Sequence, residues 1–369
     1  MDRRFFTKAT LGLIAGSMAS QPIIAAPKTN DNIKGQKSES PIIPQNDEAE
    51  EQIKVIQSKR FYKHQGKNIE GKCTSLLFFA DVHLVPAHLI KIRDFFNKHK
   101  KYIDDTIHLG DSVGDFYTGE FTLWDNFPKA LNVIGNHDTD AGKNRRCALT
   151  DNQKYDIYFK KYISGWKVKQ PENAESEGKC YWYKDYNKDL RVIGIDCMRL
   201  NDAQCKWFAE TLDGAAKKNL KVIIVTHIPP HCNKAIECNF TSLDYLPSFK
   251  SNSDYYSKLI SAVDAFISNG GTFVSWICGH NHHDSIMYTG TEKNKQLVIV
   301  MECATDFSWW TDAVHIPNTA TETCWEIISV ESISNVIKIA RFGNNYDHYL
   351  RHKGTFCYDF KNHKVISQS

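Results

Sequence analysis

Eight side chains that can bind metal ions are spread along the middle of the sequence. They are carboxylates, imidazoles and one amide: Asp81, His83, Asp111, Asn136, His137, His227, His280 and His282. This mixture of oxygen and nitrogen ligands suits zinc, manganese or iron, and it differs from the thiolate set of a soft-metal site. None of the 11 cysteines forms a C-x-x-C pair, so a cysteine-based zinc site is not expected.

The spacing of these residues suggests what they could do together. Asp81 and His83 are two residues apart, as are His280 and His282, and in extended chain such residues point to the same side. Two metal ions about 3.5–4 Å apart neutralise the oxygens of a phosphate ester and lower the pKa of a bound water until it supplies hydroxide. A nearby imidazolium can protonate the leaving oxygen. Hydrolysis of this kind needs no serine or cysteine nucleophile.

Short apolar runs precede the candidate ligands. They are Leu76 to Ala80, Ile107 to Leu109, Leu131 to Ile134, Val222 to Thr226 and Phe273 to Cys278. Runs of this length, rich in Val, Ile, Leu and Phe and closed by Gly, Asp or His, predict buried strands. Ligands of α/β sheets bind beyond the carboxyl ends of the strands, so the eight side chains should gather in one crevice.

Helical patterns and a second group of strands complete the predicted fold. Apolar residues with helical spacing cover His88 to Lys101, Ala203 to Leu212 and Tyr255 to Ile267. Strands that alternate with helices predict an α/β fold with a largely parallel sheet. Three later runs are strand-like without a long helix between them: Gln296 to Met301, Cys324 to Val330 and Val336 to Phe342. We expect them to form an antiparallel extension that completes a second sheet.

Each motif also has an ordinary structural explanation. An isolated D-x-H is commonly a surface pair, a Gly-Asp after a strand is more often a turn, and a buried His227 could simply be hydrogen-bonded in the core. The order of the motifs argues against these explanations, because five strand ends in succession carry candidate ligands.

Taken together, the motifs resemble those of the calcineurin-like metallophosphoesterases. The family signature of D-x-H, G-D, G-N-H-[DE], a lone His and G-H-x-H is present here as Asp81-Val82-His83, Gly110-Asp111, Gly135-Asn136-His137-Asp138, His227 and Gly279-His280-Asn281-His282. The resemblance covers about residues 74–303 and includes Gln204 and Trp207, which are similar to the family's Q-x-x-W. It implies a four-layer α/β sandwich of two packed β-sheets flanked by helices.

The resemblance also implies a role for each residue and a cofactor of two divalent metal ions, manganese, zinc or iron. One ion would be held by Asp81, His83 and His282, the other by Asn136, His227 and His280, and Asp111 would bridge both. His137 would act on the ester as a proton donor or charge stabiliser, with Asp138 as an orienting residue behind it.

One position departs from part of the family. Some members carry an Asp three residues after the bridging Asp, where it orients the catalytic histidine, and here that position is Gly114, with Asp115 the nearest carboxylate. The purple phosphatase branch has a tyrosine at that position and a glycine in place of His83. Its iron–tyrosinate chemistry is therefore not expected.

Four further residues could contact the substrate. His231 and His283 closely follow ligand motifs and could touch phosphate, although a surface position is the alternative. Trp309 and Trp310 could stack on a nucleobase or sugar, although packing is the commoner role of aromatic side chains.

The expected function is hydrolysis of a small phosphomonoester or phosphodiester, and the alternatives are a nuclease of the same superfamily or a non-catalytic phosphate-binding relative.

Charge and the N-terminal residues bear on partners and location. The formal net charge is +3, and residues 1–19 carry a net +2 of it, so no nucleic-acid partner is expected. The apolar run from Ala9 to Ser20 is too short for a permanent transmembrane helix, so no stable membrane anchor is expected. Residues 1–26 predict an export signal, since Arg3, Arg4 and Lys8 precede a short apolar run, and we expect a periplasmic enzyme. The arginine pair resembles a twin-arginine signal, with a general secretory signal as the alternative. Residues 27–55 predict a polar linker, and residues 56–369 the metallophosphoesterase domain with its C-terminal β extension.

Overall fold

The computed structural model describes residues 63–64, 67–68, 73–83, 86–112, 130–139, 150–160, 163, 167–232, 234–235, 253–282, 284–304, 323–331, 333–343 and 355–368. The predicted export signal and linker, Gly114, His283, Trp309 and Trp310 lie outside these residues. The short strands β1 (Lys63–His64) and β2 (Lys67–Asn68) pair with each other. Every helix in the described part of the chain is too short or too polar to span a bilayer.

The first of two large sheets contains the strands that precede the carboxylates. Its order is β16-β15-β14-β13-β3-β4-β5. The strands are β3 (Cys73–Phe79), β4 (Asp105–His108), β5 (Leu131–Asn132), β13 (Cys324–Glu331), β14 (Val336–Gly343), β15 (Thr355–Asp359) and β16 (Lys364–Gln368). β3, β4 and β5 are parallel, whereas β13 to β16 join the other side of β3 in antiparallel pairs.

The second sheet contains the strands that precede the later histidines. Its order is β6-β7-β8-β10-β12-β11-β9. The strands are β6 (Trp182–Tyr186), β7 (Leu190–Gly194), β8 (Lys221–Thr226), β9 (Lys234–Ala235), β10 (Thr272–Cys278), β11 (Ser285–Gly290) and β12 (Lys295–Val300). β7, β8, β10 and β12 are parallel, and the strands outside them pair antiparallel.

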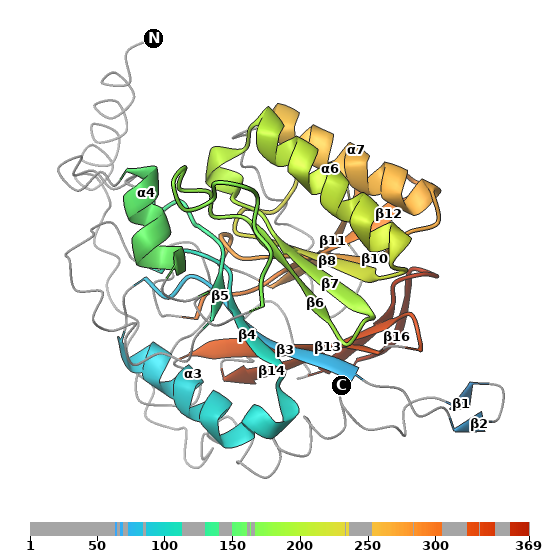
Figure 1. Cartoon of the computed structure of the whole chain (residues 1–369). Helices are drawn as coiled ribbons and strands as arrows, with labels where there is room; N and C mark the ends of the chain where they lie inside the picture. The colour runs from blue at the N-terminus through green and yellow to red at the C-terminus, as the bar shows by residue number, and fades with distance from the viewer. Residues whose placement is uncertain are drawn as a thin grey trace, which may run out of the picture. The chain divides into compact units, whose positions relative to one another are not determined.

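The two sheets and their helices form four layers (Figure 1). The helices α6 (Asp202–Lys217) and α7 (Ser253–Ser268) cover the outer face of the second sheet, and α3 (Pro86–His99) covers the outer face of the first. Near one edge lie α4 (Asp151–Lys154) and the π-helical turn Tyr155–Lys160. The α/β sandwich with two packed sheets flanked by helices is therefore confirmed.

Alternation along the strands explains this layering. In β3, Leu76 and Phe78 belong to the core between the sheets, whereas Leu77 and Phe79 pack beneath α3. A strand directs successive side chains to opposite faces, and a strand that is apolar on both faces needs cover on both sides. In α6, Phe208, Leu212 and Ala215 follow helical spacing and form its buried face.

One expectation about the strands was wrong. The run from Gln296 to Met301 was expected in the antiparallel extension, but it forms β12 of the second sheet, parallel to β10 and antiparallel to β11. The strand is buried along almost its whole length. A position inside the sheet, with a neighbouring strand on each side, therefore removes more of its apolar surface from water than an edge position would. The runs from Cys324 and Val336 form β13 and β14 and extend the first sheet as expected. Both sheets are thus mixed, with parallel centres.

Candidate metal centre

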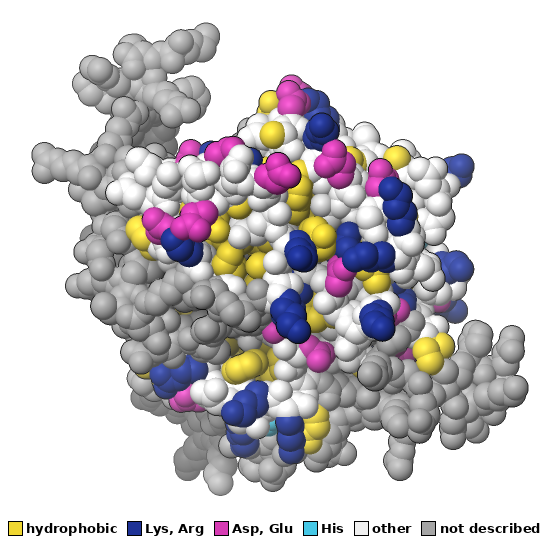
Figure 2. All heavy atoms as spheres, viewed as in Figure 1, with side chains coloured by type: hydrophobic (Ala, Val, Ile, Leu, Met, Phe, Trp, Pro, Cys, Tyr) yellow, Lys and Arg dark blue, Asp and Glu magenta, His cyan; other side chains and the backbone are white. Residues whose placement is uncertain are grey.

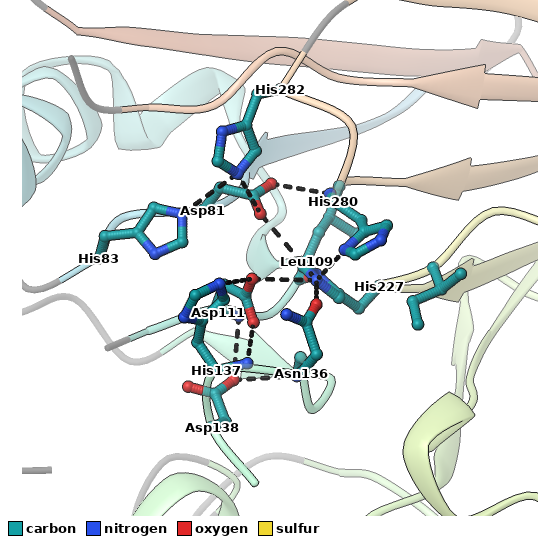
Figure 3. Close-up of polar contacts among 12 residues, drawn as sticks. Asp81, His83, Leu109, Asp111, Asn136, His137, Asp138, His227, His280 and His282 are labelled. Carbon is teal, nitrogen blue, oxygen red and sulfur yellow. Dashed lines mark hydrogen bonds and ion pairs between the residues drawn. The ribbon is translucent and has the colours of Figure 1, made fainter. Parts of the chain in front are cut away.

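The candidate ligands converge from both sheets. Asp81, Asp111 and Asn136 follow β3, β4 and β5 of the first sheet, and His227 and His280 follow β8 and β10 of the second. Their side chains point toward one another across the layer between the sheets, together with His83 and His282 (Figure 3). The carboxyl ends of the parallel strands therefore position one common cluster.

Each of the two carboxylates is fixed by one oxygen and directs the other into the cluster. Asp81 Oδ2 accepts the backbone N–H of His280 at 3.0 Å, and Asp111 Oδ1 accepts that of His137 at 2.8 Å. Asp81 Oδ1 and Asp111 Oδ2 are buried without a hydrogen bond. They lie 3.3 Å from His282 Nε2 and 3.2 Å from His227 Nε2. Buried carboxylate oxygens in this state are suited to a cation.

The imidazole nitrogens face one another in pairs. His83 Nε2 lies 3.2 Å from His282 Nε2, and His280 Nδ1 lies 3.2 Å from His227 Nε2. Two nitrogen ligands of one tetrahedral zinc ion are about 3.3 Å apart, given metal–nitrogen distances of about 2.0–2.1 Å. The separation of these donor atoms therefore fits imidazoles that share a metal ion.

A backbone contact sets the tautomer of His227. Its Nδ1–H donates to the carbonyl oxygen of Leu109 at 2.8 Å, which leaves Nε2 as the ligand atom. That nitrogen lies 2.9 Å from Asn136 Oδ1. The amide oxygen of Asn136 thus faces the same point as the imidazoles of His227 and His280.

Backbone conformation marks these residues as unusual. Asp81, His83, Asp111, His280 and His282 all have positive φ, between 49° and 73°. Non-glycine residues in this left-handed region cost of order 1–3 kcal/mol each and cluster at functional sites. Such a concentration of strain at ligand positions indicates that the site requires this geometry.

Burial and neighbouring charges have opposite effects on the pKa values of these carboxylates and imidazoles. Burial alone would raise the pKa of Asp81, but the neighbouring His282 and His227 lower it to about 2. Burial lowers the pKa of His83 to about 4, so this imidazole is neutral near pH 7 and can bind a metal. Burial also opposes the charge on His227, yet Asp111 beside it raises its pKa to about 9. Metal binding at His227 would therefore release a proton.

His137 and Asp138 differ from the inward-facing ligands. The His137 side chain is 25% exposed, its Nε2 lies 3.9 Å from Asp111 Oδ2, and its ring meets the edge of the His83 ring. Asp138 is buried and accepts the backbone N–H groups of Asp111, Ser112 and Gly135 at 2.8–2.9 Å. Asp138 therefore holds together the two loops that carry Asp111 and Asn136.

The donor set fits two metal ions. Three groups of three donor atoms could each hold an ion: Asp81, His83 and His282; Asp111, His227 and His280; and His83, Asp111 and His137. The first group is one of the two ligand sets implied by the sequence, and the second contains His227 and His280 of the other set together with Asp111, the implied bridge. The third includes His137, whose partly exposed imidazole lies beside the cluster.

The remaining residues singled out in the sequence lie elsewhere. His231 is exposed, and its carbonyl oxygen accepts the Thr289 hydroxyl at 2.7 Å. Gln204 lies on α6, where it exchanges two hydrogen bonds with the backbone of Asp196 and so holds the start of the helix. Ala304 was not singled out in the sequence, yet its N–H donates to the carbonyl of Ala80 at 2.8 Å, next to Asp81.

Comparison with known proteins identifies a family and structures of similar fold. The family model of calcineurin-like phosphoesterases matches residues 74–284. A dimetal phosphatase from Danio rerio has a similar fold, with a TM-score of 0.51 and 11% identity over 75% of this chain and 98% of that one. A phosphoesterase from E. coli gives a TM-score of 0.28 and 10% identity over 80% and 98% of the two chains. A comparison with curated protein sequences gives no match.

Proposed function

The chain belongs to the calcineurin-like phosphoesterase family, and from this membership and the geometry of the site we propose that it hydrolyses a phosphate ester at a centre of two divalent metal ions. The observation that carries the proposal is the arrangement of Asp81 and Asp111. Each carboxylate is fixed by a backbone N–H and directs its second oxygen at imidazole nitrogens of the opposite sheet.

Two sets of ligands support two ions. In this proposal Asp81, His83 and His282 hold one ion, and Asn136, His227 and His280 hold the other. Asp111 lies between the sets, since it shares one group of adjacent donor atoms with His83 and another with His227 and His280, and we assign it the bridging position. When bound, such ions neutralise the phosphoryl oxygens and lower the pKa of a bound water so that it can attack phosphorus.

His137 is proposed to act on the leaving group. The backbone N–H of His137 is tied to Asp111 Oδ1, so its position depends on the bridging carboxylate. Its imidazole is partly exposed beside the cluster, where a bound ester could reach it. From there an imidazolium can donate a proton to the leaving oxygen as the ester bond breaks.

The proposal is tested with purified full-length protein and a panel of phosphomonoesters, phosphodiesters and pyrophosphates. The protein is stripped with a chelator and reloaded with manganese, zinc or iron. We expect no hydrolysis in the stripped protein, recovery after reloading, and no recovery in Asp111→Asn. Hydrolysis that does not depend on metal would contradict the proposed activity. So would the absence of hydrolysis of every ester in the panel by protein that holds two metal ions per chain.

The alternatives give other outcomes. A non-catalytic relative would bind phosphate at the loaded site without turnover. A nuclease would bind DNA with an affinity that falls steeply with salt. The formal net charge of the chain is only +3, and the face in Figure 2 carries Lys and Arg interspersed with Asp and Glu, so the strongly basic balance typical of a polyanion-binding protein is not seen there. We therefore favour a small phosphorylated molecule.

A further inference from the structure

A buried arginine lies among three acidic side chains close to the candidate metal centre. Arg341 of β14 is 1% exposed and forms ion pairs with Asp284 and Glu302, and its Nη1 lies 3.7 Å from Glu326 Oε1. All three acidic side chains are at most 4% exposed. Burying charged groups is unfavourable unless they pair well. An apolar core would avoid this cost, so the cluster points to a role other than packing.

The strand register of the first sheet places the Arg341 side chain on the face that meets the second sheet. Arg341 pairs with Glu326 of β13, which pairs in turn with Phe78 of β3. In the preceding row of the same face, Ile339, Ile328 and Leu76 belong to the core between the sheets. The guanidinium therefore projects from the first sheet into the layer between the sheets, at the end where β3 leads to Asp81.

The two carboxylates paired with Arg341 belong to the segments that border the metal ligands. Asp284 follows His282 by two residues, and its Oδ1 accepts the backbone N–H of Glu302 at 2.9 Å. Residues 301–304 are fixed to both ligand strands. Met301 N–H donates to the carbonyl of Cys278 at 2.8 Å, and Ala304 N–H to that of Ala80 at 2.8 Å.

The ligand segment needs such support because of its backbone. His280 and His282 have φ values of 73° and 57°, and non-glycine residues keep this conformation only where the surrounding structure holds them. At one end, Asp81 Oδ2 accepts the His280 N–H. At the other end, Asp284 is held between the Glu302 backbone and Arg341.

We propose that Arg341 is a positioning residue of the metal centre, which holds Asp284 and so keeps His280 and His282 in the conformation that presents their imidazoles to the metal ions. Its charge balances Asp284 and Glu302, and without it two buried carboxylates would repel each other beside the ligand segment. The inference rests on the proposed two-metal function. The competing explanation is that the cluster only contributes to stability.

The test measures metal binding separately from stability. In Arg341→Met, we expect the Kd of full-length protein for Mn²⁺ to rise about 10–100-fold, and the visible absorption of the Co²⁺-loaded protein to change. Arg341→Lys keeps the charge and should recover part of the affinity.

The matched control is Arg191→Met. Arg191 is 2% exposed and makes two hydrogen bonds to Asp185 within the β6–β7 hairpin. This variant should unfold at a lower temperature but keep its Mn²⁺ affinity.

A second variant covers the case in which Arg341→Met does not fold. Asp284→Asn keeps an oxygen for the Glu302 N–H but removes the charge that pairs with Arg341, and it should also weaken Mn²⁺ binding. Wild-type Mn²⁺ affinity and an unchanged Co²⁺ spectrum in Arg341→Met, or in Asp284→Asn if the first is insoluble, would overturn the inference alone. Failure of the wild-type protein to bind metal would instead overturn the proposed function, and this inference with it.

Discussion

At the scale of single residues, Asp111 is central to the candidate site. It belongs to two of the three groups of donor atoms that could hold an ion, and its Oδ1 also fixes the backbone of His137. One carboxylate thus connects the metal ligands with the candidate proton donor. Its buried Oδ2 faces His227 Nε2 at 3.2 Å, and a carboxylate buried here needs a cation beside it, either the imidazolium of His227 or a metal ion.

We predict that Asp111→Asn loses both metal ions and nearly all activity, because a neutral amide cannot replace an anionic bridge. Elemental analysis of the purified protein measures the metal content. Asp105→Asn is the control, since Asp105 lies at the start of β4 and pairs with Lys184 outside the site. A variant at Asp111 that keeps two ions per chain would refute the bridging role.

For His137 we predict a loss of rate without a loss of metal. His137→Ala should keep the metal content and slow hydrolysis by roughly 10²–10⁴-fold. The loss should be smaller for esters with a good leaving group such as nitrophenol, because their departure needs little protonation. If good and poor leaving groups suffer equally, general-acid catalysis is excluded, and loss of an ion would assign His137 to the ligands instead.

At the scale of elements, the site depends on how closely the loops after the strands approach one another. A Cβ at Gly135 would lie 2.1 Å from Asp111 Oδ1 and 2.3 Å from Asp111 N. A Cβ at Gly279 would lie 2.6 Å from Asp81 Oδ2. Glycine in these motifs therefore allows the loop after one strand to pack against the carboxylate carried by another.

We predict that Gly135→Ala weakens metal binding and lowers stability by about 1–3 kcal/mol, since the new methyl group displaces the Asp111 loop. Metal content and thermal unfolding are measured side by side. The control is Gly270→Ala, where a Cβ meets no atom within 4 Å but φ is +87°. The control should lose stability through backbone strain and keep its metals. Equal metal content in both variants would show that metal binding does not require the close approach between Gly135 and the Asp111 loop.

At the scale of the whole molecule, contacts between the two sheets lie at both ends of the layer between them. Away from the site, Lys184 pairs with Asp105, and Asn187 Nδ2 donates to Thr74 Oγ1 at 2.9 Å. At the site end, Arg341 connects β14 with Asp284 and Glu302. Burial, and secondarily the charge of Glu302, raise the pKa of the nearby Glu326 to about 8.

This pKa predicts how stability depends on pH. Glu326 has an ordinary pKa of 4.5, so between about pH 4.5 and 8 the unfolded chain ionises this group while the folded protein keeps it protonated. The unfolded state then binds fewer protons, and stability falls as pH rises. Glu326→Gln should remove this fall and gain up to roughly 4 kcal/mol at pH 8. Below pH 4 the two proteins should be equally stable.

The measurement is thermal unfolding of chelator-treated protein between pH 4 and 8, so that metal binding does not contribute. Glu210→Gln, on the exposed surface of α6, should leave the pH dependence as in wild type. A Glu326→Gln variant whose stability falls with pH as steeply as wild type would show that Glu326 is ionised in the folded protein.

We also propose that the enzyme is exported, on the basis of residues 1–26. Arg3, Arg4 and Lys8 followed by a short apolar run are typical of an export signal. The mature protein should begin between about Ser20 and Lys28 and fractionate outside the inner membrane. Replacing Arg3 and Arg4 by lysine should retain folded, active enzyme in the cytoplasm if the twin-arginine route is used. A mature N-terminus at Met1 would refute export, whereas normal export of the double-lysine variant would refute only that route.

The sequence by itself determined the strand ends and the residues placed there. Apolar runs that end at Asp81, Asp111 and His227 are local features, because a strand's burial and its exit into a loop depend on the residues of that segment. The glycines of the motifs are equally local signs of close approach. The residues that the structure brings together at the strand ends could therefore be singled out from the sequence, whereas the predicted substrate contacts His283, Trp309 and Trp310 lie outside the described residues.

Only the tertiary structure decided how the strands are divided between two sheets and what holds the ligand segments. β12 is apolar enough for either sheet, and its place beside β10 follows from long-range pairing. The Arg341 cluster joins residues 39 and 57 positions apart in sequence, at Glu302 and Asp284. Such contacts leave no periodic trace, because pairing between distant segments depends on the energy of the whole packed core rather than on any single stretch of chain.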